Sequence, residues 1–293
     1  MIELKDRVAI VTGAGGGLGR CHALALARHG ARVIVNDLGD GAEAVSREII
    51  DAGGTARAIR GSVTDEQGVA AMVEQTLGEW GRIDILVNNA GILRDKSFAK
   101  MSLDDFRLVV DVHLMGSVIC TKAVWDVMRA QNYGRIVMTT SSSGLYGNFG
   151  QANYGAAKMA LVGLMQTLAI EGAKYDIRVN CLAPTAATQM TEGILPHEQL
   201  RLLSPNFVSP GVVALVADAA PTRAILCAGA GGFELANITM TRGIYVPGEP
   251  PAAEDILSSW RKLADRRDDS VPAMGWEQSR RELAKAGFEL EPA

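Results

Sequence analysis

A serine, a tyrosine and a lysine near the middle of the chain have the types and spacing needed for proton transfer. Tyr154 and Lys158 are four residues apart, so on a helix both side chains project from one face. An ammonium beside a phenol stabilises the phenolate and lowers its pKa from about 10 toward neutrality. Ser141, at the end of the preceding predicted strand, can hydrogen-bond the same substrate oxygen. The trio indicates an acid–base centre; for the Tyr–Lys pair alone, a solvated helix surface is the alternative.

A glycine-rich turn near the N-terminus fits the binding of a diphosphate. The eight residues from Thr12 are Thr-Gly-Ala-Gly-Gly-Gly-Leu-Gly, and they lie between a predicted strand and a predicted helix. Glycine lets a diphosphate approach the backbone, and the free N–H groups of the helix N-terminus then bind it. The predicted contacts are Gly13, Gly17, Leu18 and Gly19. The alternative is a plain tight turn, which the strand–turn–helix context disfavours.

An acidic residue ends the second predicted strand and bears on the choice of cofactor. Asp37 can accept hydrogen bonds from both ribose hydroxyls of an adenosine and would repel a 2′-phosphate. This favours NAD over NADP. An aspartate that only closes the turn after the strand is the alternative, and the nearby Arg20 and Arg60 could weaken the exclusion of NADP.

The elements that must hold these residues alternate between strands and helices. Short runs rich in Val and Ile predict strands at 7–12, 32–37, 55–61, 83–88, 135–141 and 177–182. Segments of helical period predict helices at 18–29, 42–52, 65–78, 103–131 and 153–175. Six strands with five crossovers predict an α/β fold with a doubly wound, Rossmann-like parallel sheet.

The pattern weakens after residue 182. Four prolines break up the segment 184–211, which predicts loop and short helix and a substrate flap over the site. A helix at 212–219 and a last strand at 231–238 follow. From residue 247 the composition turns to proline and alternating charges, with one amphipathic piece at 255–263. We therefore expect one domain over 1–246 and a C-terminal extension over 247–293.

Four motifs in chain order resemble the short-chain dehydrogenase/reductase family. They are T-G-x-x-x-G-x-G from Thr12, Asn-Asn-Ala-Gly at 88–91, the serine before the tyrosine, and Tyr-x-x-x-Lys. The resemblance covers most of the chain before the extension, and the combination is specific although each motif alone is weak. It implies that Tyr154 is the general acid/base, that Lys158 lowers its pKa and holds the nicotinamide ribose, and that Ser141 orients the carbonyl or alcohol.

The same resemblance implies further cofactor contacts. They are Asn89, Ala90 and Gly91 on the adenosine side, Ser62 and Val63 at the adenine edge, and Ala187 and Thr188 in the loop that reaches the nicotinamide amide. One candidate catalytic residue departs from the family pattern: His113 stands where many members have an asparagine that assists a proton-relay water. A packed helix histidine is the alternative.

Several segments are similar, more narrowly, to the (3R)-hydroxyacyl-CoA dehydrogenase units of type 2 peroxisomal multifunctional enzymes, also known as 17β-hydroxysteroid dehydrogenases. They include 36–39, 91–98 and 147–154. The resemblance implies NAD-dependent oxidation of a (3R)-hydroxyacyl-CoA to the 3-ketoacyl-CoA. A CoA handle should need basic residues at the pocket mouth, for which Arg94, Lys96 and Arg201 are candidates.

Two other functions stay open at this point. The apolar residues of the flap would also suit a steroid or another bulky secondary alcohol. A nucleotide-binding regulator without chemistry is the alternative of another class, and the intact Ser141, Tyr154 and Lys158 argue against it. Family resemblance also suggests a homodimer or homotetramer.

Composition limits the partners. The 293 residues hold 29 Lys and Arg against 33 Asp and Glu, a net charge of −4, so no large basic field would attract nucleic acid. No long uncharged apolar run predicts a membrane span. The four cysteines lie far apart, without metal-ligand spacing, so we expect no metal site, buried thiols and a cytoplasmic location.

Overall fold

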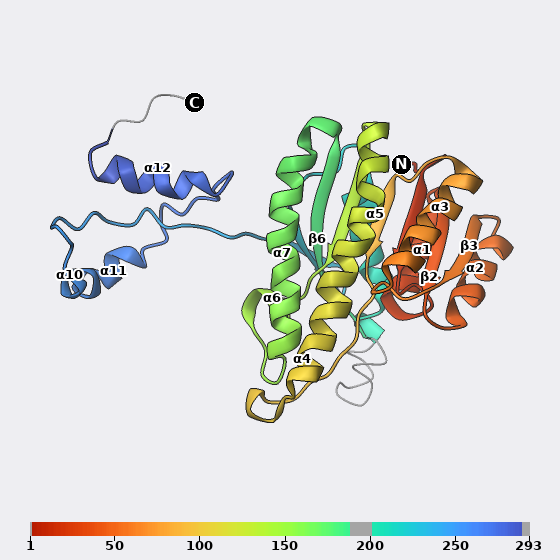
Figure 1. Ribbon diagram of the computed structural model, residues 1–293, viewed down its shortest axis with the longest axis horizontal. Helices are drawn as coiled ribbons and strands as arrows, with labels where there is room; N and C mark the ends of the chain where they lie inside the picture. The colour runs from red at the N-terminus through yellow and green to blue at the C-terminus, as the bar shows by residue number, and fades with distance from the viewer. Residues whose placement is uncertain (1, 188–200, 289–293) are drawn as a thin grey trace. The chain divides into compact units, whose positions relative to one another are not determined.

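The computed structural model describes residues 2–187 and 201–288, and contacts within the chain divide it into the units Met1–Ala236 and Asn237–Ala293. In the described part of the first unit, eight strands form one sheet in the order β3-β2-β1-β4-β5-β6-β7-β8 (Figure 1). The strands are β1 (Val8–Thr12), β2 (Arg32–Asp37), β3 (Thr55–Arg60), β4 (Ile85–Asn88), β5 (Gly134–Thr139), β6 (Ile177–Thr185), β7 (Ile225–Gly229) and β8 (Gly232–Ala236). All neighbours pair in parallel except β7 and β8, which are antiparallel.

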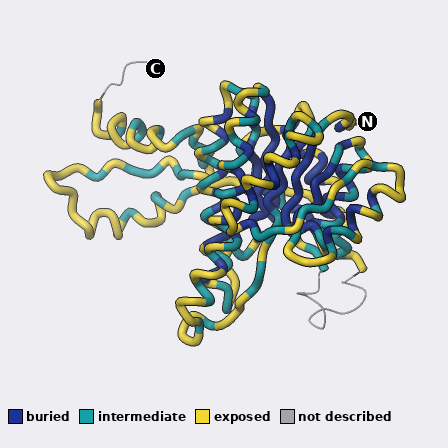
Figure 2. The backbone as a smooth tube through the Cα atoms, turned by 45° about the vertical axis from the view of Figure 1, so that its right-hand side comes forward, coloured by how far each residue is buried: buried dark blue, intermediate teal, exposed yellow. Residues whose placement is uncertain are grey.

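Helices cover both faces of this sheet. Their bounds are α1 (Gly17–Arg28), α2 (Gly41–Asp51), α3 (Glu66–Trp80), α4 (Leu103–Val110), α5 (Gly116–Gln131), α6 (Ser142–Tyr146), α7 (Ala152–Gly172) and α9 (Ser209–Val216). Apolar side chains of α1, α2 and α9 pack in one core cluster, and those of α3, α5 and α7 in another. Alternate residues of β1 point to the two clusters, as Val11 and Ile10 illustrate, because successive strand residues face opposite sides. The central strands β1, β4 and β5 are fully buried, whereas no residue of the edge strands β3 and β8 is (Figure 2).

The predicted fold class is confirmed, and two details of the strands need correction. The structure contains β7, which the sequence pattern did not predict, because its five residues form too short an apolar run between turns. The strand predicted at 231–238 is present as β8, and the six predicted parallel strands are all present. The second correction concerns β5, which ends at Thr139, so Ser141 lies beyond the strand and is the N-cap of α6.

The helix predicted over 103–131 is present but contains one wider turn. Residues Asp111–Met115 form a π-helical turn between α4 and α5. Such turns insert an extra residue and shift the side chains that follow around the helix. Among the described residues, this run is the one that is long and apolar enough to cross a membrane. Its residues Cys120, Val124 and Met128 are buried in the core beside the sheet, which is typical of a core helix in a globular protein.

The second unit contains short helices, α10 (Ala253–Ser258), α11 (Trp260–Leu263) and α12 (Trp276–Lys285). The amphipathic piece predicted at 255–263 corresponds to α10 and α11. An antiparallel bridge joins Met240 and Ser270, and the Arg281 guanidinium donates to the Ser270 hydroxyl at 2.7 Å. The predicted boundary at residue 246 lies inside this unit.

Candidate active site

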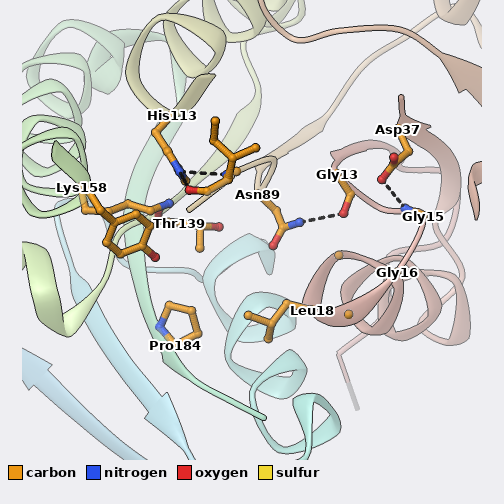
Figure 3. Close-up of a pocket in the computed structure, with 15 residues that line it drawn as sticks. Gly13, Gly15, Gly16, Leu18, Asp37, Asn89, His113, Thr139, Lys158 and Pro184 are labelled. Carbon is orange, nitrogen blue, oxygen red and sulfur yellow. Dashed lines mark hydrogen bonds between the residues drawn. The ribbon is translucent and has the colours of Figure 1, made fainter. Parts of the chain in front are cut away.

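A cavity of about 480 Å³ lies at the carboxyl edge of the sheet (Figure 3). β1 lies between β2 and β4 in the sheet. The chain runs from β1 outward through β2 to β3 on one side and continues from β4 outward on the other, and this reversal of strand order opens a crevice at the carboxyl end of β1. The described residues that line it come from the turns after β1 and β4, from the carboxyl ends of β2, β5 and β6, and from α1, the π-helical turn and α7: Gly13, Gly15, Gly16, Gly17, Leu18, Gly19, Asp37, Asn89, Gly91, Ile92, His113, Thr139, Tyr154, Lys158 and Pro184. The two motifs found in the sequence therefore share one cavity.

The glycine-rich turn is packed closely against the protein at some glycines and open to the cavity at others, which suits the binding of a diphosphate to its backbone. Gly13 has φ +62°, and a Cβ there would lie 2.7 Å from the Ala90 Cα. A Cβ on Gly19 would lie 2.1 Å from the Gly13 carbonyl oxygen. A Cβ on Gly16 or Gly17 would meet no atom within 4 Å, so the turn is open toward the cavity. The first N–H groups of α1 have no intrahelical partners, and they are the donors for an anion here.

The Asp37 carboxylate is fixed at the cavity by two backbone donors. The Gly15 N–H donates to its Oδ2 at 2.9 Å and the Gly39 N–H to its Oδ1 at 3.1 Å. A Cβ at Gly15 would lie 2.9 Å from the Asp37 Cγ, so glycine is needed for this approach. The acid at the end of β2 is thus held beside the glycine-rich turn, in the position expected for a ribose contact.

Asn89 joins the loop after β4 to the glycine-rich turn through hydrogen bonds. Its Nδ2 donates to the carbonyl oxygens of Thr12 and Gly13, each at 3.0 Å, and its N–H donates to the Thr12 hydroxyl at 3.0 Å. The Ala90 N–H donates to the same hydroxyl at 3.1 Å. Asn89 and Gly91 line the cavity, whereas Ala90 contacts Gly13 from behind. This structural role of Asn89 was not predicted, although its place at a strand end gives the signal.

Lys158 is buried in α7 and points toward β5. Its Nζ donates to the Thr139 carbonyl oxygen at 2.5 Å and lies 5.4 Å from the centroid of the Tyr154 ring. Burial lowers the pKa of Lys158 to about 7. An amine that exchanges a proton near neutrality can store or pass one beside the phenol.

The expectation that the phenol has a lowered pKa is wrong for the protein alone. Burial raises the pKa of Tyr154; a hydrogen bond with Ser141 lowers it, and the charge of Asp95 raises it further. The spacing of Tyr154 and Lys158 correctly predicted that the amine lies beside the phenol. Loss of solvation nevertheless has the largest effect on the pKa of the phenol. In the protein alone, the interaction with Ser141 favours the phenolate, but burial outweighs it.

The Ser141 hydroxyl accepts a backbone hydrogen bond and keeps its own hydrogen available for donation. Its Oγ accepts the N–H of Ser143 at 3.2 Å, as the N-cap of α6, and the side chain is buried. Because the oxygen accepts from the backbone, the hydrogen can be donated to the phenol or to a substrate oxygen. Ser141 is not among the cavity-lining residues, but its hydroxyl interacts with Tyr154, which does line the cavity, and lowers the pKa of that phenol.

His113 lies in the π-helical turn and packs against Tyr154. The two rings meet edge to face, with centroids 5.2 Å apart and planes at 87°. The Nε2 atom lies 2.8 Å from the Ile92 carbonyl oxygen, while the buried Nδ1 has no hydrogen-bond partner. Burial, and then the charge of Lys158, lower the pKa of His113 to about 3, so the ring is neutral. Gly91 faces it, and a Cβ there would lie 2.2 Å from the His113 Cε1.

The other predicted contacts lie farther from the cavity or outside the described residues. Ser62 and Val63 do not line it: the Ser62 hydroxyl is 2.8 Å from that of Thr64, and Val63 is buried in the core. The Ala187 N–H donates to the Leu203 carbonyl at 2.6 Å. Thr188 and part of the predicted flap at 184–211 lie outside the described residues. Their cofactor contacts stay predictions.

The residues present fit a dinucleotide with its nicotinamide end near Tyr154. The glycine-rich turn and Asp37 occupy one end of the cavity and Lys158 the other (Figure 3), with the Tyr154 ring beside the Lys158 amine. When bound, such a cofactor supplies the hydride acceptor or donor. Tyr154 can then exchange a proton with the reacting oxygen, which Ser141 can also contact.

A model of the short chain dehydrogenase family matches residues 7–199. The chain belongs to this family. It is 47% identical over 276 residues to a putative short-chain type dehydrogenase/reductase from Mycobacterium tuberculosis, covering 90% of this chain and 96% of that one. It is 46% identical over 280 residues to the peroxisomal hydratase-dehydrogenase-epimerase from Saccharomyces cerevisiae, covering 91% of this chain but 31% of the yeast enzyme.

Two solved structures support the same assignment. Full-length peroxisomal multifunctional enzyme type 2 from Drosophila melanogaster superposes with a TM-score of 0.84 at 38% identity, covering 97% of this chain and 50% of that one. A 7α-hydroxysteroid dehydrogenase complexed with NADH and 7-oxo glycochenodeoxycholic acid superposes with a TM-score of 0.73 at 30% identity, covering 78% of this chain and 95% of that one. The protein is an oxidoreductase that acts on CH–OH groups with a nicotinamide nucleotide.

Proposed function

We propose that the protein oxidises (3R)-hydroxyacyl-CoA thioesters to 3-ketoacyl-CoA with NAD. The observation that carries this proposal is the 46% identity to the yeast peroxisomal hydratase-dehydrogenase-epimerase over 91% of this chain. The matched part is 31% of that enzyme, so the proposal concerns a single dehydrogenase unit. The segment around Tyr154 that resembles these enzymes forms one wall of the cavity described above.

In the proposed reaction Tyr154, as phenolate, takes the proton of the substrate hydroxyl. Bound NAD supplies the acceptor for the hydride that leaves C3. Ser141 donates its free hydroxyl hydrogen to the oxygen that becomes the carbonyl. Lys158, with its pKa lowered to about 7, exchanges a proton near neutral pH and so can restore the charge state of the phenol.

The contacts of nearby arginines support NAD over NADP. Arg20 donates through its Nε to Glu48 at 2.8 Å. Arg60 contacts both Asp40, at 2.5 Å, and Glu43, at 2.6 Å. Arg20 and Arg60 are therefore each paired with at least one carboxylate. Neither arginine offers an unpaired positive charge that would attract a 2′-phosphate.

A pair of basic residues supports a substrate with phosphate groups. Lys96 lies 3.1 Å and Arg94 3.9 Å from carboxylate oxygens of the same residue, Asp105. With Asp95 between them, these two cations are balanced by two carboxylates, so the loop after β4, whose Gly91 and Ile92 line the cavity, offers two cationic side chains without a net positive charge. The phosphate groups of a CoA moiety can pair with these side chains, whereas a neutral steroid has no group that would.

A hydroxysteroid or another bulky secondary alcohol is the second candidate. The similarity to a 7α-hydroxysteroid dehydrogenase favours it. In the described part of the predicted flap, Leu202 and Phe207 are exposed and could cover an apolar substrate. A silent nucleotide-binding regulator is disfavoured because Ser141, Tyr154 and Lys158 form a connected group. A homodimer or homotetramer and a cytoplasmic location stay predictions.

A substrate panel tests the proposal. Initial rates of nicotinamide reduction would be measured with (3R)- and (3S)-hydroxyacyl-CoA of several chain lengths, hydroxysteroids and simple secondary alcohols, each with NAD and NADP. We expect the highest kcat/KM for a (3R)-hydroxyacyl-CoA with NAD. A higher kcat/KM for a hydroxysteroid would contradict the substrate, and a preference for NADP would contradict the cofactor.

A further inference from the structure

A chain of polar side chains connects the loop after β4 to the catalytic serine. The Gln151 Nε2 donates to the Asp95 Oδ2 at 2.7 Å. On the other side, the Gln151 Oε1 accepts the Ser143 hydroxyl at 2.7 Å. The Ser143 N–H then donates to the Ser141 Oγ at 3.2 Å, and the interaction of the Ser141 hydroxyl with Tyr154 lowers the pKa of that phenol. Nothing in the sequence pattern had joined residues 95 and 151.

The backbone around this chain is itself fastened. The Lys96 N–H donates to the Gly150 carbonyl oxygen at 2.9 Å. The buried Asn153 donates through Nδ2 to the Arg94 carbonyl oxygen at 3.1 Å and accepts the Tyr154 N–H through Oδ1 at 2.7 Å. These bonds hold the loop after β4 against the first turn of α7. The contact between Asp95 and Gln151 is therefore one of several hydrogen bonds that join these two segments.

The charge of Asp95 fixes which way the Gln151 amide points. A carboxylate accepts hydrogen bonds and cannot donate them, so it must face the NH₂ group of the amide. The amide oxygen is therefore turned toward Ser143, whose hydroxyl must donate to it. This bond anchors the first turn of α6, where the Ser143 N–H holds the Ser141 oxygen and leaves the Ser141 hydrogen for the site.

We propose that Asp95, Gln151 and Ser143 are positioning residues that hold the Ser141 hydroxyl against the Tyr154 phenol. The inference rests on the proposed dehydrogenase chemistry but not on the identity of the alcohol. The network touches neither the glycine-rich turn nor Asp37, so its loss should affect the chemical step and leave cofactor affinity unchanged. A hydroxyl that is misplaced by a fraction of its hydrogen-bond length loses much of its effect on the transition state.

A double-mutant cycle tests this role with whichever secondary alcohol the enzyme oxidises best. Gln151→Leu keeps the size of the side chain but removes its bonds to Asp95 and Ser143 and a third bond, at 3.1 Å, that its Oε1 accepts from the Asn148 Nδ2. We expect kcat to fall roughly 10- to 100-fold with unchanged NADH affinity. In a Ser141→Ala background the same substitution should have almost no further effect, because the residue it positions is gone. Gln278→Leu, on α12, removes an exposed glutamine as the control.

Additive losses in the cycle, or an unchanged kcat in Gln151→Leu, would overturn the proposal. A parallel loss of thermal stability and NADH affinity would instead show a role in folding, which also overturns it. If the wild-type enzyme oxidises only alcohols other than hydroxyacyl thioesters, the substrate proposal fails while the cycle can still be measured. The two failures are therefore distinguishable.

The pH profile gives a second readout. Within the described part of the chain, three ionisable side chains act on Tyr154: Lys158 on the same helix, His113 in the π-helical turn and Asp95 in the loop after β4. Asp95→Asn can still accept from Gln151 through its amide oxygen but removes the charge that raises the pKa of Tyr154. Oxidation needs the phenolate, so the acidic limb of kcat should move to lower pH. A limb that stays in place or moves to higher pH would contradict the role of Asp95, and Asp104→Asn, at an exposed carboxylate, is the control.

Discussion

Burial decides the protonation states of the side chains around Tyr154. It lowers the pKa of Lys158 to about 7 and that of His113 to about 3, and it raises the pKa of the phenol itself. The sequence predicted which groups meet, because helical spacing and strand ends determine neighbours. It could not predict the directions of these shifts, since they depend on solvent exclusion by residues far away along the chain.

Asp37 is predicted to select the cofactor through its charge. Asp37→Asn keeps an oxygen that can accept the Gly15 N–H but removes the repulsion of a 2′-phosphate. We expect the ratio of kcat/KM for NADP to that for NAD to rise by about tenfold or more, because a like-charge contact costs on the order of 1.4 kcal/mol or more. Steady-state kinetics with both cofactors measure this ratio. An unchanged ratio would show that other residues select the cofactor.

At the level of elements, the sequence predicted most of the strands and helices but not the details that orient the site. The helix over 103–131 was predicted without its π-helical turn, since hydrophobic periodicity is insensitive to one inserted residue. That turn is what places His113 beside Tyr154. Likewise, β5 was predicted to include Ser141, whereas the strand ends earlier and Ser141 begins α6.

The junction between β1 and α1 should tolerate no side chain at Gly19. A Cβ there would overlap the Gly13 carbonyl oxygen, at 2.1 Å, and the Asn89 Nδ2, at 2.5 Å. We expect Gly19→Ala to weaken NADH binding at least about tenfold, because the turn must open and the donors of α1 move. Fluorescence titration with NADH measures the affinity.

Gly78→Ala is the matched control for this substitution. Gly78 lies in α3, and a Cβ there meets no atom within 4 Å. Alanine at such a helix position should stabilise the fold slightly, by about 0.4–1 kcal/mol, and leave NADH binding unchanged. If Gly19→Ala binds NADH as tightly as Gly78→Ala does, the close packing of the turn is not needed for the cofactor.

At the level of the whole molecule, two core clusters on opposite faces of one sheet support the cavity at its edge. His22 of α1 lies in the helix layer that packs with α9, and its Nδ1 is 2.9 Å from the Ser209 Oγ. His22 is fully buried, and burial lowers its pKa to about 3. The helix that begins at the glycine-rich turn is thus bonded to the first residue of α9, a helix that begins within the predicted flap.

His22 should make the folded state sensitive to acid. Its pKa in the folded protein lies below the ordinary value of 6.5, so below that pH the unfolded chain binds a proton that the folded chain rejects. The stabilising contribution is complete above pH 6.5 and is lost as the pH falls toward 3. His22→Gln can keep the bond to Ser209 without titrating, so we expect its urea midpoint to fall less than that of the wild type between about pH 7 and about pH 4.5.

His29→Gln is the control for acid sensitivity. His29 is half-buried, with its Nδ1 at 2.8 Å from the Ile2 carbonyl oxygen, and lies outside the core. Its replacement should leave the pH dependence of the midpoint as it is in the wild type. Equal loss of stability on acidification in His22→Gln and the wild type would show that other groups account for the sensitivity.

The central claim is that Tyr154 performs the proton transfer at a site that binds the nicotinamide nucleotide independently. The most direct measurement compares Tyr154→Phe with the wild type in two assays, NADH binding and single-turnover oxidation of the best secondary alcohol. We expect NADH affinity to stay within about twofold and the oxidation rate to fall by roughly 10²- to 10⁴-fold, because the ring remains and only the proton-transferring hydroxyl is lost. A variant that keeps most of its rate would contradict the assignment.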